Sequence, residues 1–250
     1  MNAIALIPAR WASTRLPGKP LADICGKPMI WWVHNRVSEV AEIAEVIVAT
    51  DDERIVDACE VFGIKCTLTR DDHPDHISRI HEVSENIDAD FYICVNGDEP
   101  LIDPVMIRRV IPLTSVSPNS PYFQGTFRTL ASPAEAIDPN NIKLVLAHEG
   151  RCLYLSRTPI PHPQGNLAFN YLKYVGIECF NKAALDFFVS APKGMLEATE
   201  DIDHLRFIEN GVAISFIEVD SDSISVDTQK DLDFVRSVIG EDIEKEERTL

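Results

Sequence analysis

Short apolar segments alternate with amphipathic ones along the first half of the chain, and this alternation restricts the possible folds more than any other feature. Apolar segments at residues 3–7, 46–49 and 91–95 are predicted to be strands, and residues 65–68 are predicted to be a further short strand. Helices are predicted after them, at residues 29–40, 53–62 and 77–87 and from Pro104 onward. This order predicts an α/β fold, with a doubly wound, mostly parallel sheet and helices on both faces.

The second half is less regular. A hairpin is predicted at residues 142–147 and 152–155, followed by a proline-rich arm at residues 158–170. Further strands are predicted at residues 171–180 and 212–219, and further helices at residues 181–190, 196–209 and 228–239. No low-complexity linker interrupts the chain, so we predict one domain over residues 1–240. Residues 241–250 contain five acids and two bases, which predicts a frayed acidic tail.

Composition limits the partners and the compartment. The net charge is −17 and the pI is about 4.7, so the surface should repel nucleic acids and anionic lipids. We therefore expect no nucleic-acid partner and no membrane. The first apolar run is too short for a signal peptide, and the six cysteines form no C-x-x-C pair. These features predict a cytoplasmic protein with buried, unpaired cysteines.

The loop after the first predicted strand, residues 8–20, is the most distinctive motif. It contains Arg10, Arg15 and Lys19 and no acid, although the chain is strongly acidic. Small residues and prolines give it a fixed shape and close backbone approach, as a triphosphate cradle needs. The spacing of a Walker A loop is absent. A solvated basic loop is the alternative.

Two aspartates that follow apolar segments are candidate magnesium ligands. Asp98 comes after the strand at 91–95, beside Gly97, and Asp227 precedes the last predicted helix. Mg²⁺ prefers one or two carboxylates together with phosphate oxygens and water. Asp98 could instead be a capping residue in a turn, and Asp227 or Thr228 could simply be the N-cap of the last helix. A metal site requires that the two converge in space.

Several motifs, in order, resemble the 3-deoxy-manno-octulosonate cytidylyltransferase (CMP-Kdo synthetase) family. The resemblance covers about residues 2–239. Its most specific part is IPARWASTRLPGKPL at residues 7–21. It is followed by GKPMI at 26–30, VATD at 48–51, GDEP at 97–100, YLSR at 154–157, IP at 160–161, VGI at 175–177 and VDT at 226–228.

The resemblance implies a nucleotide-diphospho-sugar transferase fold, Mg²⁺ as cofactor and a homodimer. It implies transfer of CMP from CTP to the anomeric hydroxyl of an acidic keto-sugar, with release of pyrophosphate, for surface polysaccharide or lipopolysaccharide synthesis. Residues of about 155–210 would form the sugar pocket and the dimer contact.

The resemblance also assigns individual residues. Lys19, Arg15 and Asp98 would be catalytic, and Asp98 and Asp227 would bind the metal. The implied CTP-binding residues are Ala9, Arg10, Ser13, Arg15, Lys19, Arg79 and Asp98. The implied sugar-binding residues are Asn96, Arg157, Tyr174, Asp203 and His204, with Arg157 facing the sugar carboxylate.

The chain departs from the family pattern at a few positions. Asn96 stands where the family usually has Gln, and Tyr174 stands where it has His. Asp75-His76-Ile77 replaces a small Ser-Gly-Thr, and Asp203-His204 replaces Glu-Gln. These positions cluster around the expected substrate contacts, whereas the phosphate loop is intact. We infer that the chemistry is kept and that the sugar, or the base preference, can differ.

Two other functions remain open. One is a same-fold enzyme that activates another acidic sugar, such as an 8-amino-Kdo or a nonulosonate. The other is a non-catalytic homologue that binds nucleotide or sugar. The altered 75–77 loop and Asn96 favour the second, and the intact Arg10, Lys19, Asp98 and Asp227 oppose it.

Overall fold

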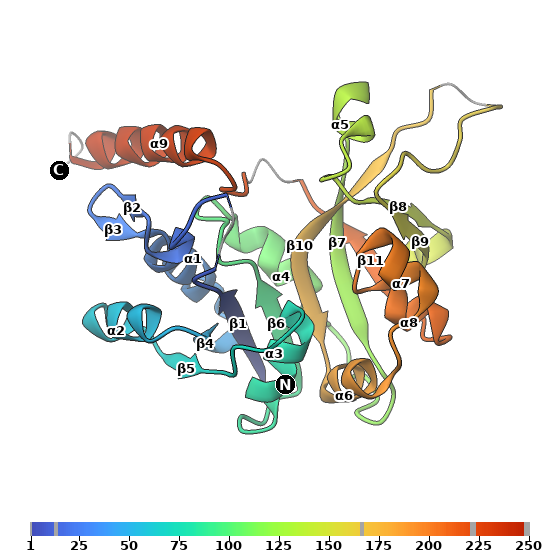
Figure 1. The fold of residues 1–250 in the computed structure, drawn as a ribbon, viewed down its shortest axis with the longest axis horizontal. Helices are drawn as coiled ribbons and strands as arrows, with labels where there is room; N and C mark the ends of the chain where they lie inside the picture. Colours follow the sequence, from blue (N-terminus) through green and yellow to red (C-terminus); the bar gives the residue numbers. More distant parts are fainter. Residues whose placement is uncertain (1, 13–14, 166–167, 221–223, 248–250) are drawn as a thin grey trace.

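A single mixed sheet organises the molecule (Figure 1). The computed structural model describes residues 2–12, 15–165, 168–220 and 224–247. Within these residues the main sheet has nine strands. Seven follow the order β11–β7–β10–β6–β1–β4–β5, β8 pairs with β10, and β9 pairs with β8.

The predicted parallel sheet is confirmed in the first half of the chain. Its strands are β1 (Ala3–Ala9), β4 (Ile43–Thr50), β5 (Cys66–Leu68) and β6 (Phe91–Val95). β1 pairs in parallel with β4 and β6, and β4 pairs in parallel with β5. The carboxyl ends of these strands therefore lie at one edge of the sheet, where ligands bind in folds of this class.

The second half extends this sheet mostly with antiparallel pairs, together with one parallel pair between β11 and β7. Its strands are β7 (Phe123–Thr129), β8 (Lys143–Leu146), β9 (Cys152–Ser156), β10 (Leu172–Phe180) and β11 (Ser215–Glu218). β10 runs antiparallel to both β6 and β7. β7 was not predicted, because Gly125 interrupts its apolar pattern. A Cβ at Gly125 would lie 2.5 Å from the Phe216 ring, so this glycine allows β11 to pack closely.

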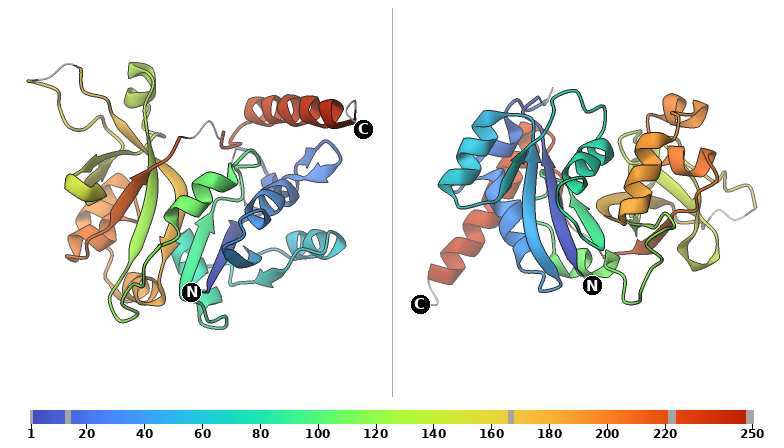
Figure 2. Two further views of the ribbon diagram at one scale, coloured as in Figure 1. Left: turned by 180° about the vertical axis from the view of Figure 1, so that it is seen from behind. Right: turned by 90° about the horizontal axis from the view of Figure 1, so that it is seen from below.

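Helices cover both faces of the sheet, as predicted (Figure 2). One face packs against α1 (Met29–Ser38), α2 (Glu53–Val61) and α4 (Pro104–Val110). The other packs against α3 (His76–Ser84), α6 (Lys182–Ser190) and α8 (Leu205–Glu209). Side chains of a strand point alternately to the two faces. Accordingly, Ala5 and Ile7 of β1 enter the first core, and Ile4 and Leu6 enter the second.

Two helical predictions differ from the structure. The single helix predicted at 196–209 is divided into α7 (Met195–Glu200) and α8, because Asp201 has left-handed backbone angles with φ of 53°. The last helix, α9 (Gln229–Glu247), extends well beyond residue 239 into the predicted tail. Its apolar side packs on Ile24 and Met29, in a third core that includes the unpredicted hairpin β2 (Asp23–Ile24) and β3 (Lys27–Pro28).

The remaining elements are short: the 3₁₀ turns η1 (Lys19–Leu21) and η2 (His148–Gly150) and the helix α5 (Pro133–Ile137). None of the helices in the described ranges combines the length and apolar character that crossing a membrane requires.

Candidate active site

A cavity of about 550 Å³ opens at the carboxyl ends of β1 and β6. The loop after β1 contributes residues 8–10, Ala12, Arg15, Lys19 and Pro20. The start of α3, the loop after β6 and the segment before α9 complete its walls with Asp75, His76, Arg79, residues 96–98 and Asp227. The basic loop and both candidate metal ligands, widely separated in sequence, therefore face one space.

A tight closure shapes the basic loop. The Gly18 amide donates to the Trp11 carbonyl over 3.2 Å, and Gly18 has left-handed backbone angles with φ of 68°. A Cβ on Gly18 would lie 2.9 Å from the Trp11 ring, so only glycine fits this closure. The chain then enters η1 at Lys19, whose side chain is 15% exposed and points into the cavity.

Lys19 lies between the two aspartates. Its Nζ is 2.6 Å from Asp98 Oδ2 and 3.3 Å from Asp227 Oδ1. The Arg15 guanidinium also reaches Asp227, at 3.0 Å. The two carboxylates converge, which is the condition for a shared metal site.

A backbone hydrogen bond brings Asp227 to Asp98. The Val226 amide donates to the Asp98 carbonyl over 2.8 Å. Asp231 then fixes the start of α9, since its Oδ2 accepts from the Thr228 amide at 2.8 Å and from the Asp227 amide at 3.2 Å. The Asp231 amide donates to Thr228 Oγ1 in return, at 3.3 Å, which is a capping box. Thr228 is therefore the residue that caps α9, and the Asp227 carboxylate faces the cavity.

Asp231→Ala is expected to lower the free energy of unfolding by about 1 kcal/mol, the usual cost of losing a helix cap. It should also weaken divalent-cation binding, because the Asp227 amide loses its acceptor. Urea unfolding and a cation titration would measure the two effects. Asp233→Ala is the matched control, since Asp233 lies on the exposed side of the same helix, and its change should stay within about 0.5 kcal/mol. Equal losses in both variants would contradict the capping role.

The residues present fit a hard divalent cation. Asp98 Oδ1 is buried, and no described residue supplies it with a hydrogen-bond partner. A buried carboxylate oxygen without a partner is costly unless a cation or water satisfies it. Two carboxylates beside a space for phosphate oxygens are the donor set that Mg²⁺ prefers.

Other predicted nucleotide-binding residues also border the cavity. Ala9 and Arg10 lie at the end of β1, and Arg79 lies on α3. The Arg79 side chain is 1% exposed and is held by Asp51 at 2.8 Å and by Thr69 at 2.5 Å. These bonds fix Arg79 in the wall and occupy part of its guanidinium. Ser13 lies outside the described residues.

The five residues predicted to bind sugar are divided among three places. Asn96 lines the cavity. Arg157 does not: its guanidinium donates to the carbonyls of Glu200, Asp201 and Pro139, at 2.6, 2.8 and 3.2 Å. Arg157, which follows β9, is therefore bonded to the end of α7.

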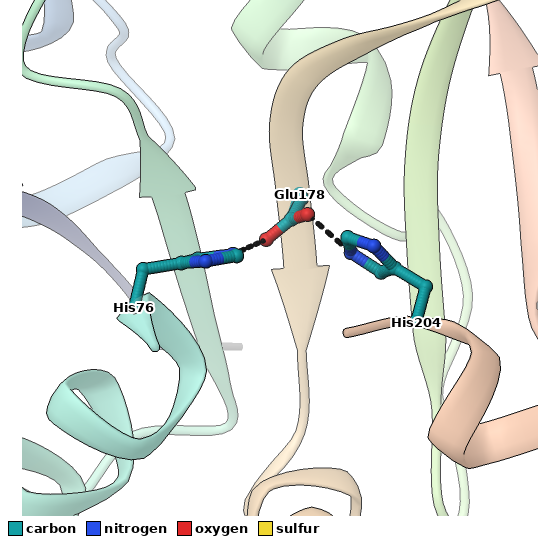
Figure 3. A group of neighbouring side chains, drawn as sticks. All are labelled: His76, Glu178 and His204. Atoms are coloured by element: carbon teal, nitrogen blue, oxygen red, sulfur yellow. Dashed lines mark hydrogen bonds and ion pairs between the residues drawn. The ribbon is translucent and has the colours of Figure 1, made fainter. Parts of the chain in front are cut away.

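Tyr174, Asp203 and His204 are not among the residues that line the cavity, and they lie close to the buried Glu178 of β10 or to His76. Figure 3 shows Glu178 between His76 and His204. His204 Nε2 lies 2.5 Å from one Glu178 oxygen, and the Tyr174 hydroxyl donates to the same oxygen. His76 Nε2 lies 3.0 Å from the other oxygen, and His76 Nδ1 lies 3.7 Å from Asp203. His76 borders the cavity and so connects it to this group.

Charge in this group shifts the pKa values. Burial alone would lower the pKa of His76, but the Glu178 carboxylate raises it to about 9. Burial would likewise raise the pKa of Glu178, but His204 and His76 hold it well below its usual range. Burial and Glu178 together raise the pKa of the Tyr174 hydroxyl. Glu178 was missed from sequence, although a lone acid inside the apolar strand at residues 175–180 was a usable signal.

Comparisons with known proteins agree with this arrangement. Residues 4–216 match the family model described as cytidylyltransferase. The 3-deoxy-manno-octulosonate cytidylyltransferase of Escherichia coli is 39% identical over 97% of this chain and 98% of its own. That of Syntrophotalea carbinolica is 42% identical over 93% and 96%.

A solved structure gives the same result. It is a CMP:2-keto-3-deoxy-manno-octonic acid synthetase complexed with CTP, 39% identical, with a TM-score of 0.90 over 97% of this chain and all of the other. Sequence and structure thus agree over nearly the full length of the chain. The chain described here therefore belongs to the cytidylyltransferase family, within the group of 3-deoxy-manno-octulosonate cytidylyltransferases.

Proposed function

We propose that this enzyme transfers CMP from CTP to the anomeric 2-hydroxyl of 3-deoxy-manno-octulosonate and releases pyrophosphate. The observation that supports this most directly is the convergence of Arg15, Lys19, Asp98 and Asp227 in one cavity. The names of the relatives and the CTP complex of the similar structure point to the same substrates. The product would be an activated sugar for lipopolysaccharide or capsule synthesis.

The basic loop would bind the triphosphate. Arg10, Arg15 and Lys19 face the cavity in a chain of net charge −17, so they form a local positive region in a repulsive surface. Arg15 and Lys19 would contact the β- and γ-phosphates and stabilise the charge that grows on pyrophosphate as it leaves. Ala9, at the end of β1, and Ser13 would contact the remainder of the nucleotide.

Asp98 and Asp227 would hold Mg²⁺. Bound there, Mg²⁺ would neutralise phosphate charge and make the attacking hydroxyl more acidic. Lys19 lies between the two carboxylates and partly balances their charge. Lys19 would move to the phosphates when the cation and CTP enter.

The reaction would be a single displacement at the α-phosphorus. The sugar hydroxyl oxygen forms the new bond to phosphorus, and the bond from the α-phosphorus to the bridging oxygen breaks. The chain contributes by holding the reactants in line and by placing fixed cations where negative charge accumulates. No side chain needs to form a covalent intermediate.

The sugar would lie near Asn96 and His76. Asn96 packs against Gly176 of β10, since a Cβ on Gly176 would lie 2.0 Å from Asn96 Nδ2. The wall here contains several departures from the family pattern, and another acidic sugar is therefore the second candidate. A panel of CTP and other nucleoside triphosphates with several keto-sugar acids, read by pyrophosphate release, would identify the pair used. Tight CTP binding without turnover on any sugar would indicate a non-catalytic binding protein instead.

Gly176→Ala is expected to lower kcat/KM for the sugar by about 10-fold, equivalent to one lost hydrogen bond of about 1.4 kcal/mol. The added methyl group would displace Asn96 from its position in the wall. Gly165→Ala is the control, because a Cβ at Gly165, in the arm, has no atom within 4 Å. Steady-state kinetics of both variants would test this, and an unchanged kcat/KM for Gly176→Ala would exclude Asn96 as a sugar contact.

The enzyme would work as a homodimer, with residues of about 155–210 at the contact. It would act in the cytoplasm, where CTP is available. All six cysteines are free, which suits a reducing compartment. Sedimentation of the purified chain would establish its oligomeric state.

A further inference from the structure

His76, Glu178 and His204 bring three metal-binding side chains together from three separate elements (Figure 3). Their nearest nitrogen and oxygen atoms all lie within 4.8 Å of one another. The Glu178 and His204 side chains are 1% and 4% exposed, whereas His76 is 28% exposed toward the cavity. The group is therefore a buried site with one open side.

The group is formed by residues that distinguish this chain from the family pattern. His76 stands where the pattern has Gly, and His204 stands where it has Gln. Tyr174, which hydrogen-bonds to Glu178, is a third departure. These positions are far apart in sequence, and the fold brings them to one carboxylate.

We propose that His76, Glu178 and His204 bind a divalent transition-metal cation, with Zn²⁺ as the reference ion, at a site distinct from the Asp98–Asp227 pair. Two imidazoles and one carboxylate are the protein ligands of several zinc enzymes, whose fourth position is left for water or substrate. Imidazole favours Zn²⁺ and similar ions, whereas carboxylates alone suit Mg²⁺. The two sites should therefore select different cations.

The present distances show what an ion would have to change. Ligand atoms about 2.1 Å from one Zn²⁺ ion lie about 3.0 Å apart at a right angle and about 3.4 Å apart at a tetrahedral angle. His76 Nε2 already lies 3.0 Å from one oxygen of Glu178, whereas His204 Nε2 lies 2.5 Å from the other oxygen, so the His204 and Glu178 side chains would have to move apart to admit the ion.

The proposed ion would have to displace a proton from His76, because the Glu178 carboxylate raises the pKa of His76 to about 9. Binding requires an unprotonated Nε2 on each ring, and those protons would leave to solvent through the cavity. His76 would keep its Nδ1 proton, with Asp203 at 3.7 Å as its orienting carboxylate.

Zinc binding by the full, untagged chain would test the proposal directly. Chelator-stripped protein would be titrated with Zn²⁺ against a chromophoric competitor, with excess Mg²⁺ present to saturate the carboxylate pair. We expect one tight Zn²⁺ per chain. His204→Gln and His76→Gly, which restore the family residues, should each weaken it by about 100-fold, and Asp203→Asn by about 10-fold. Co²⁺ should give visible absorption bands that both ligand variants lack.

His81→Gln is the matched control. His81 lies on α3 and pairs with Asp186 at 3.0 Å, outside the cluster, so its removal should leave Zn²⁺ affinity unchanged. Equal Zn²⁺ affinity in the wild type and in His204→Gln would overturn the proposal. An equal loss in His81→Gln would also overturn it, because it would indicate adventitious surface binding. These readouts do not depend on turnover, so they are independent of the proposed reaction.

Discussion

Asp98→Asn is expected to reduce magnesium-dependent turnover by at least about 100-fold, because a metal ion supplies several kcal/mol of charge stabilisation and each 1.36 kcal/mol is tenfold in rate. The amide keeps the size of the side chain but removes the negative charge, and it leaves Asp227 as the only carboxylate of the pair. The backbone carbonyl of residue 98 still accepts from Val226, so the local fold should persist. Steady-state kinetics over a range of Mg²⁺ concentrations would measure the loss.

Asp103→Asn is the control for this prediction. Asp103 lies close in sequence, caps α4 through the Val105 amide at 2.8 Å, and lies outside the cavity. Asparagine caps helices as well as aspartate does, so turnover and stability should be preserved. A near-normal kcat in Asp98→Asn would place the metal elsewhere.

Lys19→Ala is expected to lower kcat by about 10²–10³-fold, the range found when one preorganised charge-stabilising group is removed. It should also tighten Mg²⁺ binding to the free enzyme, because Lys19 Nζ lies between the two carboxylates and competes with the cation. A lower kcat together with a higher affinity for Mg²⁺ is expected because Lys19 lies between the two carboxylates. Kinetics and a direct Mg²⁺ titration would measure them.

The control for Lys19 is Lys65→Ala. Lys65 forms an exposed ion pair with Glu45 at 2.7 Å, and such pairs contribute about 0–1 kcal/mol. Its removal should leave both measurements unchanged. A Lys19 variant that raises KM for CTP but keeps kcat would make Lys19 a ground-state ligand only.

Local patterns predicted most of the fold. The strands at residues 3–7 and 91–95 were recognisable because strands buried on both faces are continuous apolar runs. β7 was missed because tertiary packing against Phe216 requires the glycine that breaks its pattern. Likewise, α9 continues through an acidic segment because its apolar side covers the hairpin at residues 23–28, a contact that no local rule predicts.

The candidate site divides in the same way. The basic loop was evident from sequence, since its three cations stand out in an acidic chain. Two other features of the site depend on long-range contacts. Asp227 lies near Asp98 because Val226 bonds to the Asp98 carbonyl, and Arg157 donates to the carbonyls of Glu200 and Asp201. Glu178 can be recognised as a candidate ligand only because the fold places His76 and His204 beside it.

By itself, the sequence determined the alternation of strands and helices and the isolated basic loop, because both are short-range properties of charge and hydrophobicity. Only the tertiary structure decided which acidic groups converge on Lys19 and which two histidines lie beside Glu178. Those pairings join residues up to 208 positions apart, as Lys19 and Asp227 are. They are set by the strand order of the sheet and the packing of its helices, which local sequence does not encode.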